Sequence, residues 1–173
     1  YAVLAYQTAY LKYHYPQEYM AALLTSVLGQ TGKVSEYIAQ CKDLGITVLP
    51  PDVNESRADF TVAGDNIRFG IGAVKNVGVG LIEHLVKERE ENGKFQSFED
   101  FCQRMSDHDL NKRMLENLIK CGAFDSLGHR RSQLMAVYVG ILDAASSDKK
   151  KNLEGQIDLF ADFRDEMPVR TTM

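Results

Sequence analysis

Glycines cluster between residues 70 and 80 of this 173-residue chain, and a glycine-rich loop is a common phosphate-binding element. Two nucleotide-binding patterns are excluded by the residue types. A GxGxxG fingerprint would need glycine where Lys75 stands, and a GxxxxGK loop followed by Ser or Thr is absent. A tight turn between two helices fits better, with Asn76, Val77 and Gly78 in the turn and an apolar stripe in the helix that follows.

Such a turn can bind the DNA backbone. Asn and Gly tolerate positive φ, and Gly78 and Gly80 carry no side chain that would hold a phosphate away, so backbone N–H groups at a helix start can point at phosphate oxygens. We expect Val77 to plug the turn and Lys75 to supply positive charge. This pattern is typical of a helix-hairpin-helix module, with Asn76 in place of the usual first glycine. An ordinary helix cap is the alternative.

A second candidate turn closes the run NKRMLENLIKCGAFDSLG. Gly122 is its turn glycine and Phe124 its apolar plug, after a helix with an apolar stripe. We expect the basic residues of this stretch to gather near the turn and to contact phosphates: Lys112, Arg113, Lys120, Arg130 and Arg131. The alternative is an ordinary solvated helix face.

A short motif near the C-terminus has the form of a docking peptide. Gln156, Asp158, Leu159 and Phe160 follow a polar stretch. Leu159 and Phe160 can anchor in an apolar pocket of a partner while Gln156 bonds at its rim. The alternative is that these apolar residues fold back on their own domain.

The remaining polar residues assemble no catalytic or metal site. The four histidines lie in separate segments without ligand spacing, and no paired nucleophile and base is found. Three widely spaced cysteines indicate neither a disulfide framework nor a zinc knuckle. The net charge of −4 excludes a uniformly basic coating protein but leaves room for a local basic face. No apolar run is long enough to span a bilayer, so we expect a soluble, cytoplasmic protein with no membrane partner.

The elements that must position these residues are mostly helical. Apolar spacing predicts three helices before Gly45, with a break at Pro16, and we expect their apolar residues to pack in a core. The segment ITVLPP is typical of an edge strand, and the runs on either side of AGDN indicate a β-hairpin. Four further helical segments follow, and SSDKKKNLEG is polar enough to be a linker.

The predicted fold class is therefore mainly α with a small β-hairpin: a helical bundle plus a tandem helix-hairpin-helix. We predict three regions. Residues 1–46 form a helical unit, residues 47–145 hold the β-hairpin and the helix-hairpin-helix region, and residues 146–173 form a flexible linker and a docking tail.

The run YAVLAYQTAYLKYHYPQEYMAALLTSVL, together with GITVLPPDVNES, IRFGIGAVKNVG, NKRMLENLIKCGAFDSLG and GQIDLF, resembles the bacterial C-family replicative polymerases, the DNA polymerase III alpha subunits. The resemblance extends in order over nearly the whole chain. It implies the end of a fingers region, then tandem helix-hairpin-helix turns that track the duplex backbone, then the start of a clamp-binding region.

The resemblance also implies the partners. Duplex DNA would lie at the turns, a ring-shaped sliding clamp would take the peptide containing Leu159 and Phe160, and other replisome subunits would lie nearby, in a bacterial cytoplasm at the nucleoid. The catalytic aspartates of the family, with their Mg²⁺ ions, have no counterpart in these residues, so we expect no catalytic residue and no cofactor here. A structural scaffold without DNA affinity is the alternative function.

Overall fold

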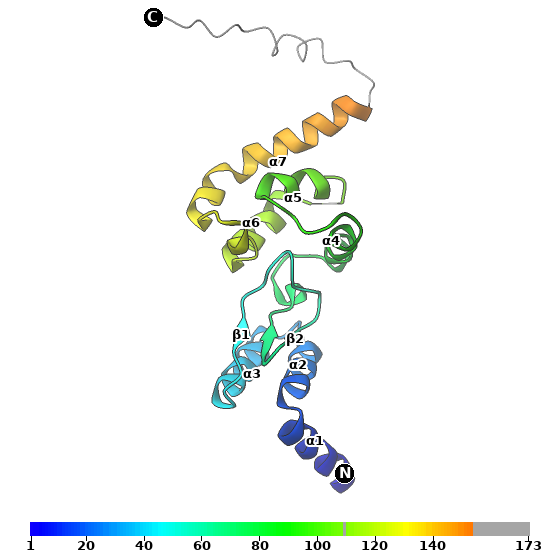
Figure 1. Cartoon of the computed structure of the whole chain (residues 1–173), viewed down its shortest axis with the longest axis vertical. Helices are drawn as coiled ribbons and strands as arrows, with labels where there is room; N and C mark the ends of the chain where they lie inside the picture. The colour runs from blue at the N-terminus through cyan, green and yellow to red at the C-terminus, as the bar shows by residue number, and fades with distance from the viewer. Residues whose placement is uncertain (109, 154–173) are drawn as a thin grey trace, which may run out of the picture.

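The computed structural model describes residues 1–108 and 110–153, and of residues 149–153 only the helical backbone. Helices α1 to α3 and a small sheet form one half of an elongated molecule, and α4 to α7 form the other (Figure 1). The elements are α1 (Ala2–His14), α2 (Pro16–Ser26), α3 (Thr31–Asp43), β1 (Val48–Leu49), β2 (Thr61–Ala63), β3 (Asn66–Arg68), the 3-10 turn η1 (Ile71–Ala73), α4 (Val79–Asn92), α5 (Phe98–Met105), α6 (Lys112–Cys121), the 3-10 turn η2 (Asp125–Leu127) and α7 (Arg131–Leu153). The mainly α class with a small sheet, predicted from the sequence, is confirmed.

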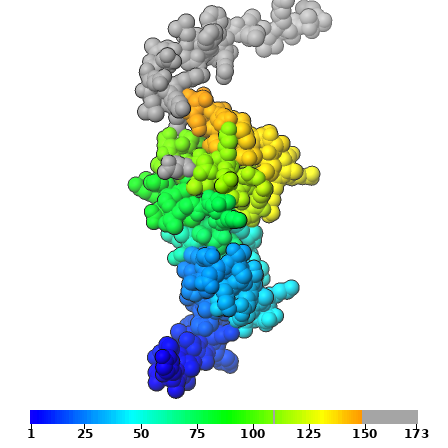
Figure 2. Space-filling model, turned by 180° about the vertical axis from the view of Figure 1, so that it is seen from behind, coloured from blue at the N-terminus to red at the C-terminus, as the bar shows by residue number. Residues whose placement is uncertain are grey.

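The first and third helices end where the sequence predicts, whereas α2 ends at Ser26, before the predicted stop at Gly29. Tyr15, with φ −134° and ψ 60°, separates α1 from α2, because Pro16 disfavours helical geometry in the residue before it. Gly45 follows α3 at φ +75°. One expectation was wrong: α1 buries none of its residues and projects at one end of the molecule (Figure 2). Its apolar side chains are spread around the helix, so no single face could pack.

The sheet has the strand order β1-β3-β2. Strands β2 and β3 form the predicted antiparallel hairpin, with Val62 opposite Ile67, and β1 adds as a parallel edge strand with Val48 opposite Ile67. The double proline after Leu49 suits an edge, where a missing N–H leaves no neighbour unpaired. The sheet therefore connects the N-terminal helices to the segment that carries the first turn.

Two apolar cores divide the molecule. The smaller one joins α2 and α3 to the sheet through residues such as Met20, Leu24 and Ile67. The larger one fills the space between α4, α5, α6 and α7. At its centre the Phe124 ring meets the rings of Phe98 and Phe101 edge to face, each at 4.9 Å between centroids. The larger core thus holds both candidate turns in one rigid unit.

Arg104 ties α4 and α5 together at the rim of the larger core. Its Nε donates to Glu88 at 2.8 Å, its Nη1 donates to Asp100 at 3.3 Å, and its guanidinium carbon lies 4.3 Å from the centroid of the Phe95 ring. Its Nη2 also donates to the backbone carbonyls of Glu88 and Gly93. The Arg104 side chain is only 17% exposed, so its ion pair with Glu88 stabilises the fold more than an ordinary surface ion pair does.

We expect acid to weaken this contact. The hydrogen bond from Arg104 lowers the pKa of Glu88 below its ordinary value. A carboxylate whose pKa is lower in the folded state stabilises the fold above its unfolded pKa of about 4.3, and that contribution is lost as the pH falls through the lower, folded value. Urea unfolding at pH 7, 5 and 3.5 should show stability falling less steeply below pH 5 in Glu88→Gln than in the wild type. An identical pH dependence in the two proteins would contradict this role.

Helix α7 extends further than the sequence indicated. The predicted linker begins at residue 146, but the helix continues to Leu153. The polar residues from Ser146 onward include good helix formers, and the first helix-breaking residue after them is Gly155. Low apolar content argued for a linker, but a helix that is already nucleated can extend through polar residues without burying them.

Candidate nucleic-acid interface

The first turn, residues 74–78, joins η1 to α4. Asn76 takes φ +62°, as expected of a residue that tolerates the left-handed region. Val77 is half-buried and packs against the larger core, as predicted for the plug. Gly78 is extended, at φ −76°. One expectation was wrong: the element before the turn is a 3-10 turn of three residues and not a helix. Gly70 and Gly72 pack against the backbone of Ala58 and Asp59 too closely for a side chain.

The N-terminus of α4 is open to solvent. Its N-cap residue, Gly78, offers no side-chain acceptor, and no carboxylate lies in the first turn of the helix. The N–H groups of Val79, Gly80 and Leu81 therefore have no acceptor among the described residues. Open space surrounds the α-carbon of Gly80, since a β-carbon there would meet nothing within 4 Å. Exposed N–H donors at the positive end of a helix dipole form an anion-binding arrangement.

The start of α6 lies beside this turn. A β-carbon at Gly78 would lie 3.8 Å from the Met114 methyl group. The rings of His84 and His108 stack at 4.3 Å, which joins the second turn of α4 to the segment before α6. Asn111 caps α6 by accepting a hydrogen bond from the Met114 N–H at 2.9 Å. The sequence did not show that the first turn and the start of α6 lie side by side, because no local pattern links positions about thirty residues apart.

The second turn, residues 122–130, has the predicted plug and turn glycine. Phe124 is 1% exposed. Gly122 ends α6 in the left-handed conformation, at φ 87° and ψ 16°, and its N–H donates to the Ile119 carbonyl. Gly122 is itself buried, since its α-carbon faces the guanidinium of Arg131.

Several of the predicted basic residues are paired within the domain. Arg131 donates through Nη2 to Asp125 at 2.6 Å and through Nη1 to the Lys120 carbonyl at 3.2 Å. The hydrogen bond with Asp125 raises the pKa of Arg131. Lys112 pairs with Asp143 at 3.1 Å, and Lys120 pairs with Glu116. Within the described part of the chain, the exposed side chains of Lys75, Arg113 and Arg130 have no carboxylate partner.

The expectation that five basic residues gather at the second turn was wrong. Lys120, Arg130 and Arg131 lie there, but Lys112 and Arg113 lie at the other end of α6. A helix of ten residues is about 15 Å long, so the two groups are well separated. Lys112 and Arg113 instead share the first turn of α6 with Met114, the residue that lies close to Gly78.

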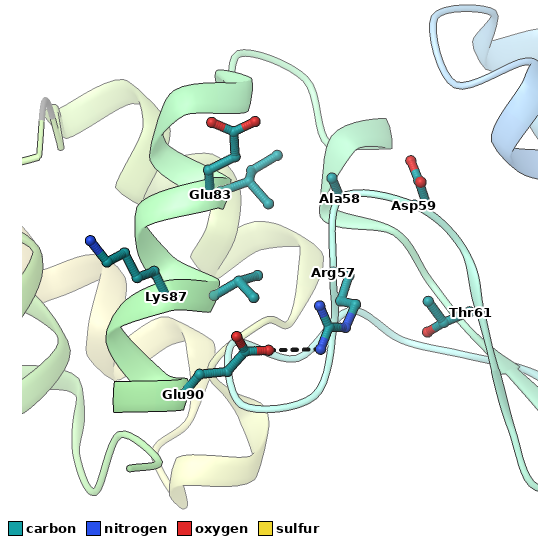
Figure 3. A pocket seen from close by; sticks show the side chains of 9 residues that line it. Arg57, Ala58, Asp59, Thr61, Glu83, Lys87 and Glu90 are labelled. Atoms are coloured by element: carbon teal, nitrogen blue, oxygen red, sulfur yellow. Dashed lines mark hydrogen bonds and ion pairs between the residues drawn. The ribbon is translucent and has the colours of Figure 1, made fainter. Parts of the chain in front are cut away.

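A cleft lies away from both turns. A cavity of about 410 Å³ opens between α4 and the segment before β2. Glu83, Lys87 and Glu90 line it from the helix, Arg57 and Asp59 line it from the other side, and Arg57 pairs with Glu90 at 2.7 Å (Figure 3). None of the predicted DNA-binding residues lines it, and its charges are mixed.

The remaining predictions concern a docking peptide, a metal site and a membrane span. The predicted docking peptide, with Gln156, Asp158, Leu159 and Phe160, lies outside the described residues. Across residues 1–108 and 110–153, no cluster of three or more His, Cys, Asp or Glu is arranged to hold a metal ion. In the same part of the chain, no helix combines the length and apolar character needed to cross a membrane.

Comparison with known proteins identifies the class. A family model described as a helix-hairpin-helix motif matches residues 45–134, more than half of the chain and the region with both turns. The chain belongs to this helix-hairpin-helix family. Its homologues are DNA polymerase III alpha subunits: that of Mycobacterium tuberculosis is 49% identical over 160 residues, that of Thermus aquaticus 46% over 165, and that of Vibrio cholerae 42% over 166.

The matched regions cover 92%, 95% and 95% of this chain, and 14%, 13% and 14% of the three relatives. The chain therefore spans about one seventh of the length of the curated relatives that it matches.

Proposed function

We propose that this chain binds the sugar-phosphate backbone of duplex DNA without reading base sequence. The observation that carries the proposal is the open N-terminus of α4, where three N–H groups without acceptors among the described residues lie beside Lys75 and the exposed start of α6. Backbone donors and Lys or Arg side chains contact phosphates, which every DNA sequence shares.

The test is duplex binding measured against salt concentration. Each phosphate contact made by a cation contributes about −0.9 to the slope of log K against log [salt]. We expect binding at low salt with a slope of roughly −2 to −4, because few unpaired cations lie near the turn, and equal affinity for duplexes of unrelated sequence. A structural scaffold would give no binding at any salt concentration, and that result would refute the proposal.

A wider role follows from the named relatives, which are polymerase subunits. We assign this chain to a polypeptide that performs template-directed DNA synthesis in a bacterial cytoplasm. Nucleotide transfer would need carboxylates and Mg²⁺ ions. We assign these to parts of the relatives outside the matched region, and we expect the purified 173-residue chain to incorporate no nucleotide.

We also propose that the segment with Gln156, Asp158, Leu159 and Phe160 tethers the chain to a sliding clamp. Its support is the sequence alone: two apolar anchors beyond a polar stretch. Replacing both Leu159 and Phe160 by Ala should lower affinity for the clamp at least a hundredfold, because buried apolar anchors dominate such short interfaces. Calorimetry can measure this, with Asp162→Ala as the control, and retained affinity would refute the assignment.

A further inference from the structure

The two turns differ in how their backbone N–H groups are used. In the second turn, N–H groups donate to main-chain carbonyls of the same turn or of the helix before it: those of Gly122, Ala123, Asp125, Leu127 and Gly128. At the first turn, the N–H groups of Val79, Gly80 and Leu81 have no acceptor in the described parts of the chain. At the start of α7, after the second turn, the N–H groups of Arg130, Gln133 and Leu134 have acceptors, and only those of Arg131 and Ser132 have none among the described residues. The first turn therefore has the longer run of unpaired backbone donors, three in succession at a helix start.

The second turn is also covered by its own side chains. Arg131 and Asp125 form a bidentate pair above Gly122, with Nε to Oδ1 at 3.0 Å and Nη2 to Oδ2 at 2.6 Å. A β-carbon at Gly122 would lie 2.3 Å from Nη2 of Arg131. The guanidinium thus fills the space that a phosphate would need, and its charge is already matched by a carboxylate.

The first turn has the opposite character. Lys75 is exposed, as is Arg113, which precedes Met114 in the first turn of α6, and neither has a carboxylate partner in residues 1–108 and 110–153. Lys112, next to Arg113, has only an exposed pair with Asp143, which costs little to exchange for a phosphate. A β-carbon at Gly78 would lie 3.8 Å from the Met114 methyl group, so the first turn and the start of α6 lie side by side.

On the basis of the proposed duplex binding, we propose that the two turns have different functions. A grip surface, formed by Lys75, the α4 N-terminus and Arg113, holds the DNA backbone. The second turn is a brace that ends α6 and fixes the start of α7 without touching DNA. Arg131 is a positioning residue of this brace, and Arg130 is solvated surface.

A matched pair of variants tests this division in the full 173-residue chain. Arg113→Ala and Arg130→Ala each remove one exposed arginine that has no carboxylate partner among the described residues. Arg113 comes from the start of α6, beside the first turn, and Arg130 comes from the second turn. With a 20-base-pair duplex, we expect Arg113→Ala to reduce the salt slope by about 0.9 and Arg130→Ala to leave it unchanged. An equal reduction in both variants, or a reduction only in Arg130→Ala, would overturn the division.

Arg131→Lys provides a second readout. It keeps the positive charge but loses the bidentate pair. We expect a lower Tm with an unchanged salt slope, and a reduced slope at an unchanged Tm would contradict the brace. A wild-type chain that binds no duplex would instead refute the proposed function itself, so the two failures can be distinguished.

Discussion

Gly80→Asp should abolish most duplex binding while leaving the fold at least as stable as before. The new carboxylate would stand among the free N–H groups at the start of α4, in space that is empty in the wild type. It would occupy the donors and repel phosphate, with a cost to binding of about 1–4 kcal/mol, which lowers the affinity roughly fivefold to 900-fold. Fluorescence anisotropy with a labelled duplex at low salt measures this.

The same substitution suits the helix. Aspartate in the first turn interacts favourably with the helix dipole, and replacing glycine lowers the conformational entropy of the unfolded chain. A loss of binding therefore could not be attributed to unfolding. Gly80→Asn, which is similar in size and neutral, is the control and should retain more of the affinity. Unchanged binding by Gly80→Asp would show that the α4 N-terminus is not the DNA contact.

Phe124→Ala should be among the most destabilising single changes in the chain. Phe124 is 1% exposed and touches two other aromatic rings at the centre of the larger core. Truncating such a residue removes buried apolar surface and leaves a cavity, at a cost of about 3–5 kcal/mol of unfolding free energy. Since domains of this kind are stable by only about 5–15 kcal/mol, the urea midpoint should fall sharply.

Phe124→Leu keeps most of the volume and should cost less than half as much. A loss below about 1 kcal/mol in Phe124→Ala would mean that the second turn is not held by this plug, contrary to its position against Phe98 and Phe101.

Local features of the fold could be predicted because they depend on neighbouring residues. Pro16 disfavours helical geometry in the residue before it and so begins a new helix, and Gly122 takes a positive φ that other residues resist. The plug at Phe124 followed from its place between a helical stripe and a glycine. Each of these predictions depended on only a few neighbouring residues.

The candidate site was less predictable because its parts come from distant segments. The closeness of Gly78 to Met114 depends on how α4 and α6 pack, and the ion pairs of Lys112 and Arg131 depend on the path of α7. Composition marked the basic residues, but only the structure separated those with carboxylate partners from those without. The exposure of α1 was missed because its apolar content suggested a buried helix, although its apolar side chains are spread around the helix.

The continuous helix from Arg131 to Leu153 has a geometric consequence for whatever follows it. Its 23 residues span about 35 Å, and each residue advances the chain 1.5 Å and turns it by about 100°. Adding or removing one residue after Ala145 would therefore redirect the chain beyond Leu153 far more than it would change its reach. In this protein the length of α7 therefore determines the direction in which the helix ends, relative to the larger core on which it begins.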